Sequence, residues 1–298
     1  SRGLGDVYKR QQYACDVDGI VSVDPVFIQK MVEINGNVTL EDGTVLTGKN
    51  TAEYMLNTIY KEVPVSLQDT YFEYIASTIM NNAFSNMDIT KMMKVAQSIG
   101  ELTRNRHFYA YTFHDDEAKY FQGAGLAKGT PDSETDPEVG IYLNEQNPSK
   151  LGWYIDRKAQ ITKTGQNADG SKTYHVTYTL TNTLTSSEMA TCTGYILGGE
   201  QAGVTGKPVA APGTSAQRML FYAPKGGSIS EITSSGDVRD QSNAVMDDQK
   251  LVTNVAYIAP GESVTFDFDI TTSPKAESDL TIDQTPSGKV TNEVNYQY

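Results

Sequence analysis

The sequence predicts an α+β protein of two parts, an α/β part followed by an all-β sandwich of the immunoglobulin-like type. Up to about residue 150, short β-branched runs alternate with stretches of helical periodicity, which is typical of α/β layers. Beyond that point Thr, Tyr, Val, Gly and Ser dominate, and alternating strands are separated by Gly, Pro and Asp turns. We therefore expect a tail over 1–11, an α/β domain over 12–150 and a β-sandwich domain over 151–298.

The first elements carry clear boundary signals. A β-branched run over 17–23 predicts a strand, and Asp24-Pro25 then supplies an N-cap and a first helical residue. Asn35-Gly36 predicts the end of that helix, because both residue types tolerate the left-handed conformation. Asp42-Gly43, between two short β-branched runs, predicts the turn of a hairpin.

Three more helices and a strand are expected before residue 114. Apolar residues at helical spacing predict helices over about 50–60, from Ser66 to about 83, and over 87–99, and the aromatic run 108–113 predicts a strand. The acidic run 114–117 has the residue types of a metal site. We favour a short helix capped by Asp115 or Asp116, because Asp is a preferred N-cap and acidic residues suit the first helical turn.

The second half is expected to be built from strands. Alternation of apolar and polar residues predicts strands over 174–183 and 263–270, and shorter apolar runs predict strands over 219–222 and 252–257.

Composition excludes some classes of partner. The net charge is −13, from 24 Lys+Arg against 37 Asp+Glu, whereas nucleic-acid binding requires clustered basic residues. Hydrophobic residues make up 38% of the chain, which fits a folded protein. We therefore expect no nucleic-acid partner.

Known catalytic patterns are missing from the sequence. There are three histidines and none lies in an H-E-x-x-H arrangement, and neither a G-x-S-x-G elbow nor a phosphate-binding loop occurs. We therefore assign no catalytic residue, no cofactor-binding residue, no metal ligand and no cofactor.

One aromatic cluster is a candidate ligand surface. Trp153 and Tyr154 stand beside Lys150 and Arg157, and such rings combine an apolar face with a polar tip that suits carbohydrate or protein ligands. The alternative is that this stretch joins the two domains and packs its rings there.

Cys15 and Cys192 are the two cysteines of the chain. In an oxidising compartment they could form a disulfide between the two domains, and two separate thiols are the alternative.

A series of motifs resembles domain-of-unknown-function family 4012, found in envelope proteins of Gram-positive, mainly actinobacterial, cells. The segments that carry the resemblance are 18–25, 36–47, 139–144, 150–157, 180–183 and 284–288. Members usually carry an N-terminal transmembrane helix. The resemblance therefore implies an extracellular, membrane-anchored envelope protein whose anchor lies upstream of this chain, with a wall polymer or an envelope protein as partner.

Residues 1–11 resemble the translated sequencing-adapter tail found at the ends of many metagenomic proteins, with a natural N-terminus as the alternative. We accordingly expect a metagenomic fragment whose contact with the membrane is made through the missing anchor alone.

A fainter resemblance to LytR-CpsA-Psr glycopolymer transferases covers the segment from Thr47 to Tyr54 and the helix entered at Gln68. The arginines of that family do not recur, since no Arg occurs between Arg10 and Arg104, and Lys is a poorer bidentate donor to pyrophosphate. The expected function is therefore non-catalytic binding or scaffolding at the cell wall. The alternatives are a divergent transferase whose catalytic residues lie mostly upstream, or a calcium-stabilised adhesin domain.

Overall fold

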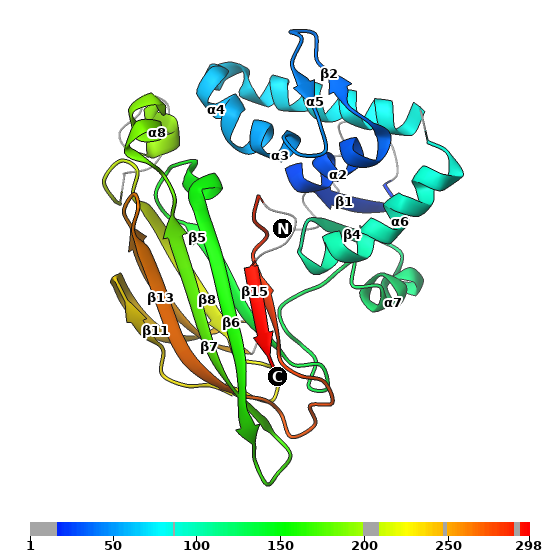
Figure 1. Ribbon diagram of the computed structural model, residues 1–298. Coiled ribbons are helices and arrows are strands. Elements are labelled where there is room, and N and C mark those ends of the chain that lie inside the picture. Colours follow the sequence, from blue (N-terminus) through cyan, green and yellow to red (C-terminus); the bar gives the residue numbers. More distant parts are fainter. Residues whose placement is uncertain (1–16, 86, 199–208, 247–248, 289–292) are drawn as a thin grey trace.

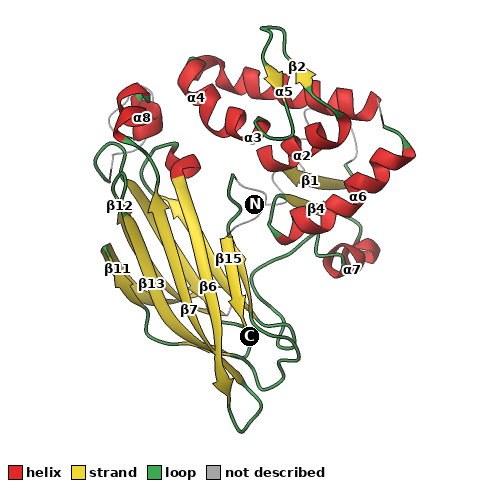
Figure 2. Cartoon of the chain, in the orientation of Figure 1, coloured by secondary structure: helices red, strands yellow, loops and turns green. Residues whose placement is uncertain are grey.

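The computed structural model describes residues 17–85, 87–198, 209–246, 249–288 and 293–298. Helices gather in the first part of the chain and long strands in the rest, so that a helical part lies beside an elongated β part (Figures 1 and 2). Among the described residues, no helix is both long and apolar enough to cross a membrane.

The helical part contains two short antiparallel strand pairs, which are β1 (Gly19–Val23) with β4 (Phe108–Thr112) and β2 (Val38–Thr39) with β3 (Val45–Leu46). Its helices are α2 (Pro25–Asn35), α3 (Thr51–Glu53), the π-helical turn η1 (Tyr54–Thr58), α4 (Ile59–Glu62), α5 (Val65–Ser85), α6 (Ile89–Arg104) and α7 (Asp115–Gly123). The alternation of strands and helices in the sequence suggests parallel strands, whereas β1 and β4 pair antiparallel. These two strands are adjacent in space although several helices separate them in the chain.

Local signals explain where α2 begins and ends. Asp24 Oδ1 accepts hydrogen bonds from the amides of Val26 and Phe27 at 2.9 and 3.1 Å, which satisfies two donors that have no partner within the helix. Gly36 follows the helix with φ of +102°, a conformation that costs glycine least. The buried face of α2 packs against α5 and α6 around Ile75, Ile79 and Leu102, among others.

Two predicted helix starts in this part are wrong. α5 begins at Val65, so Ser66 lies inside the helix rather than at its cap. α7 has His114 at its N-cap, with Asp115 and Asp116 in the first turn, where their charges still complement the helix dipole. The helix expected over 87–99 is present as α6, and its Met92 and Met93 are exposed.

The β part consists of two sheets. Its strands are β5 (Glu138–Glu145), β6 (Ile155–Gln166), β7 (Lys172–Asn182), β8 (Ser215–Tyr222), β9 (Ser228–Ile229), β10 (Thr233–Ser235), β11 (Asp237–Met246), β12 (Gln249–Ile258), β13 (Ser263–Thr271), β14 (Thr281–Gln284) and β15 (Glu293–Gln297). One sheet has the order β10-β13-β7-β6-β15, with β9 also on β13, and the other has the order β11-β12-β8-β5-β14. The two C-terminal strands pair in parallel, β14 with β5 and β15 with β6.

A single hydrophobic core fills the space between these two sheets. Phe221 of β8 packs against Phe266 and Phe268 of β13, with ring centroids 5.1 and 5.6 Å apart and edge-to-face geometry. Tyr174, Tyr178 and alternate residues of the neighbouring strands complete the same buried cluster. The apolar residues of the alternating sequence pattern thus face the core, and the polar residues between them face solvent.

The β part begins earlier than the change in sequence composition suggests. β5 pairs with β8 and β14 in the five-stranded sheet, so residues 138–145 lie in the β part and not in a helical domain that ends at 150. Short helices α8 (Ser186–Thr191) and α9 (Gly194–Leu197) also interrupt the strand-rich region.

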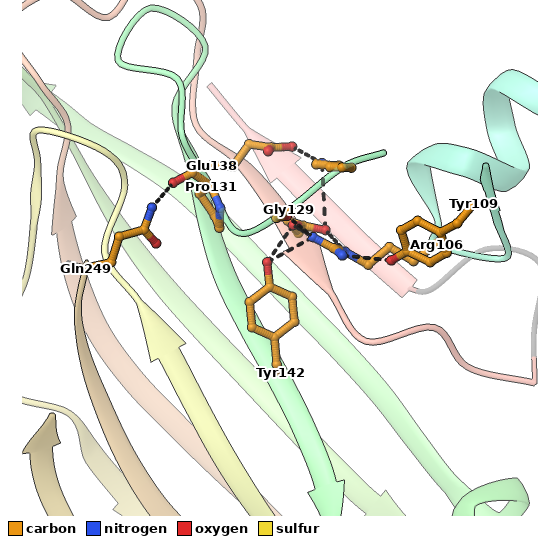
Figure 3. Close-up of polar contacts among 9 residues, drawn as sticks. Arg106, Tyr109, Gly129, Pro131, Glu138, Tyr142 and Gln249 are labelled. Carbon is orange, nitrogen blue, oxygen red and sulfur yellow. Dashed lines mark hydrogen bonds and ion pairs between the residues drawn. The ribbon is translucent and has the colours of Figure 1, made fainter. Parts of the chain in front are cut away.

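A buried ion pair joins the two parts (Figure 3). Arg106 follows α6 with φ of +63° and reaches the fully buried Asp283 of β14, with Nε 2.6 Å from Oδ1 and Nη2 bonded to Oδ2. The Tyr142 hydroxyl of β5 donates to the same carboxylate at 2.6 Å, and Lys128 Nζ lies 3.7 Å from it. Arg106 also donates to the Tyr109 hydroxyl at 2.7 Å. This network fixes β14 against the helical part.

Candidate functional site

A pocket of about 280 Å³ is lined by residues of the β part, close to the contacts that Gly288 and Tyr154 make with the helical part. Its lining comes from three segments that are distant in the sequence. The first supplies Gly152, Trp153, Ile155, Asp156 and Arg157, the second supplies Thr183, and the third supplies Ser287, Gly288 and Glu293. The first segment leads into β6, Thr183 directly follows β7, and the third joins β14 to β15. Parallel pairing of β15 with β6 brings the third segment to the first.

A short 3₁₀ turn, η2 (Leu151–Tyr154), positions the tryptophan of the pocket. Leu151 and Tyr154 are buried and anchor the turn, so that Gly152 and Trp153 remain at the surface of the pocket. The Tyr154 hydroxyl donates to Asn57 Oδ1 of η1 at 3.0 Å, which ties the turn to the helical part. The Tyr154 carbonyl accepts from both the amide and the hydroxyl of Thr183, at 2.8 and 2.9 Å.

The indole of Trp153 is packed by a glycine. A Cβ atom at Gly288 would lie 2.8 Å from the ring carbons of Trp153 and 3.1 Å from a methyl of Leu56 in η1. Gly288 therefore allows the chain to lie directly against the indole, because it has no side chain there. Leu56 of the helical part lies next to the same glycine. Trp153 remains partly exposed and lines the pocket.

Arg157 supplies the positive charge of the pocket. Its Nη1 donates to the carbonyl of Thr285, and its buried Nε has no hydrogen-bond partner among the described residues. Beneath it, the Tyr178 hydroxyl donates to Gln284 at 2.7 Å. Burial raises the pKa of Tyr178 to about 12, although the charge of Arg157 acts in the opposite direction, so this phenol is neutral at physiological pH.

The structure separates the four residues of the predicted ligand surface. Trp153 and Arg157 line the pocket together. Tyr154 is turned inward to Asn57, and burial raises the pKa of its phenol. Lys150 lies elsewhere, with Nζ 5.1 Å from the ring centre of Tyr60 and 5.4 Å from that of Tyr195. Tyr154 thus has the alternative role stated in the sequence analysis, since it packs where the helical part and the β part join.

The predicted cysteine pair is only half described. Cys192 forms no disulfide with any described residue, and its Sγ lies 3.6 Å from the Tyr154 hydroxyl. Cys15 lies outside the described residues, so the pairing stays a prediction.

Several residues of the pocket were not singled out from the sequence. Asp156, Thr183, Ser287, Gly288 and Glu293 line it beside Trp153 and Arg157. All of these residues except Glu293 lie in the segments 150–157, 180–183 and 284–288, which carry the family resemblance. Their occurrence in those segments is the sequence signal that could have identified them as one site.

The donor set of the pocket suits recognition of a polar, ring-shaped ligand. It offers an indole face, the hydroxyl groups of Thr183 and Ser287, two carboxylates and one guanidinium. Within the part of the chain that the structure describes, no three metal-ligating side chains converge.

The comparisons with known proteins place the chain near one family. The model of the family described as "Protein of unknown function (DUF4012)" matches residues 3–60, which confirms the predicted resemblance over that range. The matched range includes most of segment 1–11, whose origin in an adapter stays a prediction and lies outside the described residues. The motifs from residue 139 onward lie beyond the match, and the resemblance to LytR-CpsA-Psr proteins gains no support from it.

No curated protein matches the chain. Among solved structures, a protein from Legionella pneumophila subsp. pneumophila str. Philadelphia 1, provisionally described as a nutrient binding protein, is 13% identical with a TM-score of 0.23. The match covers 47% of this chain and 44% of that one, so the chain spans less than half of its length.

Proposed function

We propose that this protein is a non-catalytic envelope protein that binds or scaffolds wall components, and that the pocket beside Trp153 holds a saccharide unit of a wall polymer. One observation carries the proposal, namely the convergence of three distant segments on a partly exposed indole surrounded by hydroxyl, carboxylate and guanidinium groups. Such a ring stacks on the apolar face of a sugar, while the polar groups bond to its hydroxyls.

The proposal includes a finer description of the fold and the location. The β part is an immunoglobulin-like sandwich, supported by its two facing sheets and shared core, and the chain is displayed outside a Gram-positive cell. The support for the location is the family resemblance. Surface labelling of cells that express the full-length gene tests it, and labelling that requires cell lysis would contradict it.

The transferase alternative has no supporting observation among the described residues. Arg106, which lies in the helical part beyond the segments compared with those enzymes, directs its guanidinium to Asp283, Tyr109, Tyr142 and the Gly129 carbonyl. A guanidinium held in this way is a structural group and not a free donor for pyrophosphate.

The test is co-sedimentation of the purified protein with Gram-positive sacculi. Trp153→Ala should abolish binding, and Lys150→Ala, which changes a cation outside the pocket, should leave it intact. Asp156→Asn serves as a second variant because it changes the pocket without removing the packed indole. Equal sedimentation of the wild type and both pocket variants, with melting temperatures unchanged, would remove the pocket from the proposal.

A further inference from the structure

A second hollow lies next to the Trp153 pocket, on the outer face of the six-stranded sheet. Its volume is about 440 Å³, and its lining comes from β6, β7 and β15, namely Lys158, Ala159, Gln160, Thr177, Thr179, Glu293, Val294 and Asn295. The register pairs Gln160 with Thr177 on one side and with Asn295 on the other. Three neighbouring strands therefore present polar side chains to the same hollow.

The two hollows adjoin at a shared lining residue. Glu293 lines both of them, and Asp156 of the first and Lys158 of the second are alternate residues on the same face of β6. Lys158 Nζ lies 3.1 Å from Glu293 Oε2, so an ion pair sits where they meet. From Ile155 to Gln160 the strand extends by roughly 17 Å at about 3.3 Å per residue, which is longer than one sugar ring.

We propose that the two hollows are subsites of one groove that binds a glycan as an extended chain. This inference rests on the proposed function, and it adds the class of ligand, a polymer rather than a free sugar. The Trp153 pocket holds one unit by stacking, and the sheet face holds the units that follow by hydrogen bonds.

The chemistry of the second hollow favours a hydroxylated chain of low charge density. Four of its eight lining residues carry amides or hydroxyls, and the side-chain amide of Asn295 makes no hydrogen bond among the described residues. Thr177 donates to Asp267 at 2.6 Å, which leaves its oxygen available as an acceptor. Across both hollows Asp156 and Glu293 balance Arg157 and Lys158 in formal charge. This balance disfavours a densely charged polyanion, and the scarcity of apolar side chains on the sheet face disfavours a lipid chain.

The test uses glycan strands released from Gram-positive sacculi and separated by length, titrated calorimetrically into the full chain. Affinity should rise at least tenfold between one unit and four units. The double variant Gln160→Ala with Asn295→Ala should lose that gain and keep the affinity for one unit. Both side chains are exposed on the sheet face, so the fold should be unaffected. Thr164→Ala is the matched control, because Thr164 lies exposed on β6 beyond the hollow.

The outcomes separate this inference from the proposed function. If four units bind no tighter than one unit while intact sacculi still bind through Trp153, the extended groove is refuted and the proposed function stands. If neither sacculi nor any released strand binds, both are refuted. A polar peptide that competes better than the longest glycan strand would also overturn the assignment of the groove to a glycan.

Discussion

Removing the carboxylate of Asp283 should weaken the junction between the two parts by a large and measurable amount. Asp283 is fully buried and accepts two hydrogen bonds from Arg106 and one from Tyr142. Asp283→Asn keeps the shape of the side chain and leaves the Arg106 cation buried without its counter-charge. Breaking a buried pair in this way costs about 3–5 kcal/mol.

The chain carries its own probe for this measurement. Trp153 is the single tryptophan, and it lies at the junction against Gly288 and Leu56. Equilibrium unfolding in guanidinium chloride, followed by tryptophan fluorescence, should show the junction transition of Asp283→Asn moved down by about 1 M, given a slope of about 4 kcal/mol per molar.

A matched pair on the surface provides the control. Arg239 and Asp237 form the same kind of fork, with Nε 2.7 Å from Oδ1, and both are exposed. Asp237→Asn should leave the transition unchanged, because exposed ion pairs contribute little. Equal midpoints for the two variants would refute the view that the buried pair holds the two parts together.

Three further changes have defined outcomes. Gly288→Ala should displace the indole of Trp153, which a shifted emission maximum and weaker binding to sacculi would reveal, since the added Cβ meets ring carbons at 2.8 Å. Asp24→Ala should lower the stability of the helical part by about 2 kcal/mol in thermal unfolding followed by circular dichroism, because it removes a side-chain N-cap. Asp279→Asn should flatten the acid limb of the stability curve. The hydrogen bond from Lys163 is the main cause that lowers the pKa of Asp279. The ionised Asp279 therefore contributes to the free energy of unfolding above about pH 4, and this contribution is lost as the pH falls through the lowered pKa. Parallel acid limbs for the wild type and this variant would contradict the last expectation.

Much of the local structure could be predicted because its causes are local. Asp24 caps α2 and Pro25 is its first residue, as the capping side chain and the fixed φ of proline predict. The Asp42-Gly43 turn lies between β2 and β3. Strand 174–183 was visible because the core of the sandwich takes every second residue. In each case the residues that determine the element are neighbours in the chain.

The features that could not be predicted depend on pairing between distant segments. β5 resembles its surroundings in composition, and its pairing with β8 and β14 is what places it in the β part. Ser287 and Glu293 join Trp153 because β15 pairs in parallel with β6, more than a hundred residues away in sequence. Lys150 and Tyr154 were grouped with Trp153 by proximity in the chain, and the 3₁₀ turn directs their side chains to different partners.

The most direct test of the central claim is the fluorescence of Trp153 during titration with a four-unit wall glycan strand. Because the chain has a single tryptophan and that residue lines the pocket, a ligand in the pocket must change its environment. We predict a saturable change in emission, with the same midpoint as the calorimetric titration and unaffected by Lys150→Ala. Calorimetric binding with no change in Trp153 emission would show that the glycan binds elsewhere and would contradict the account.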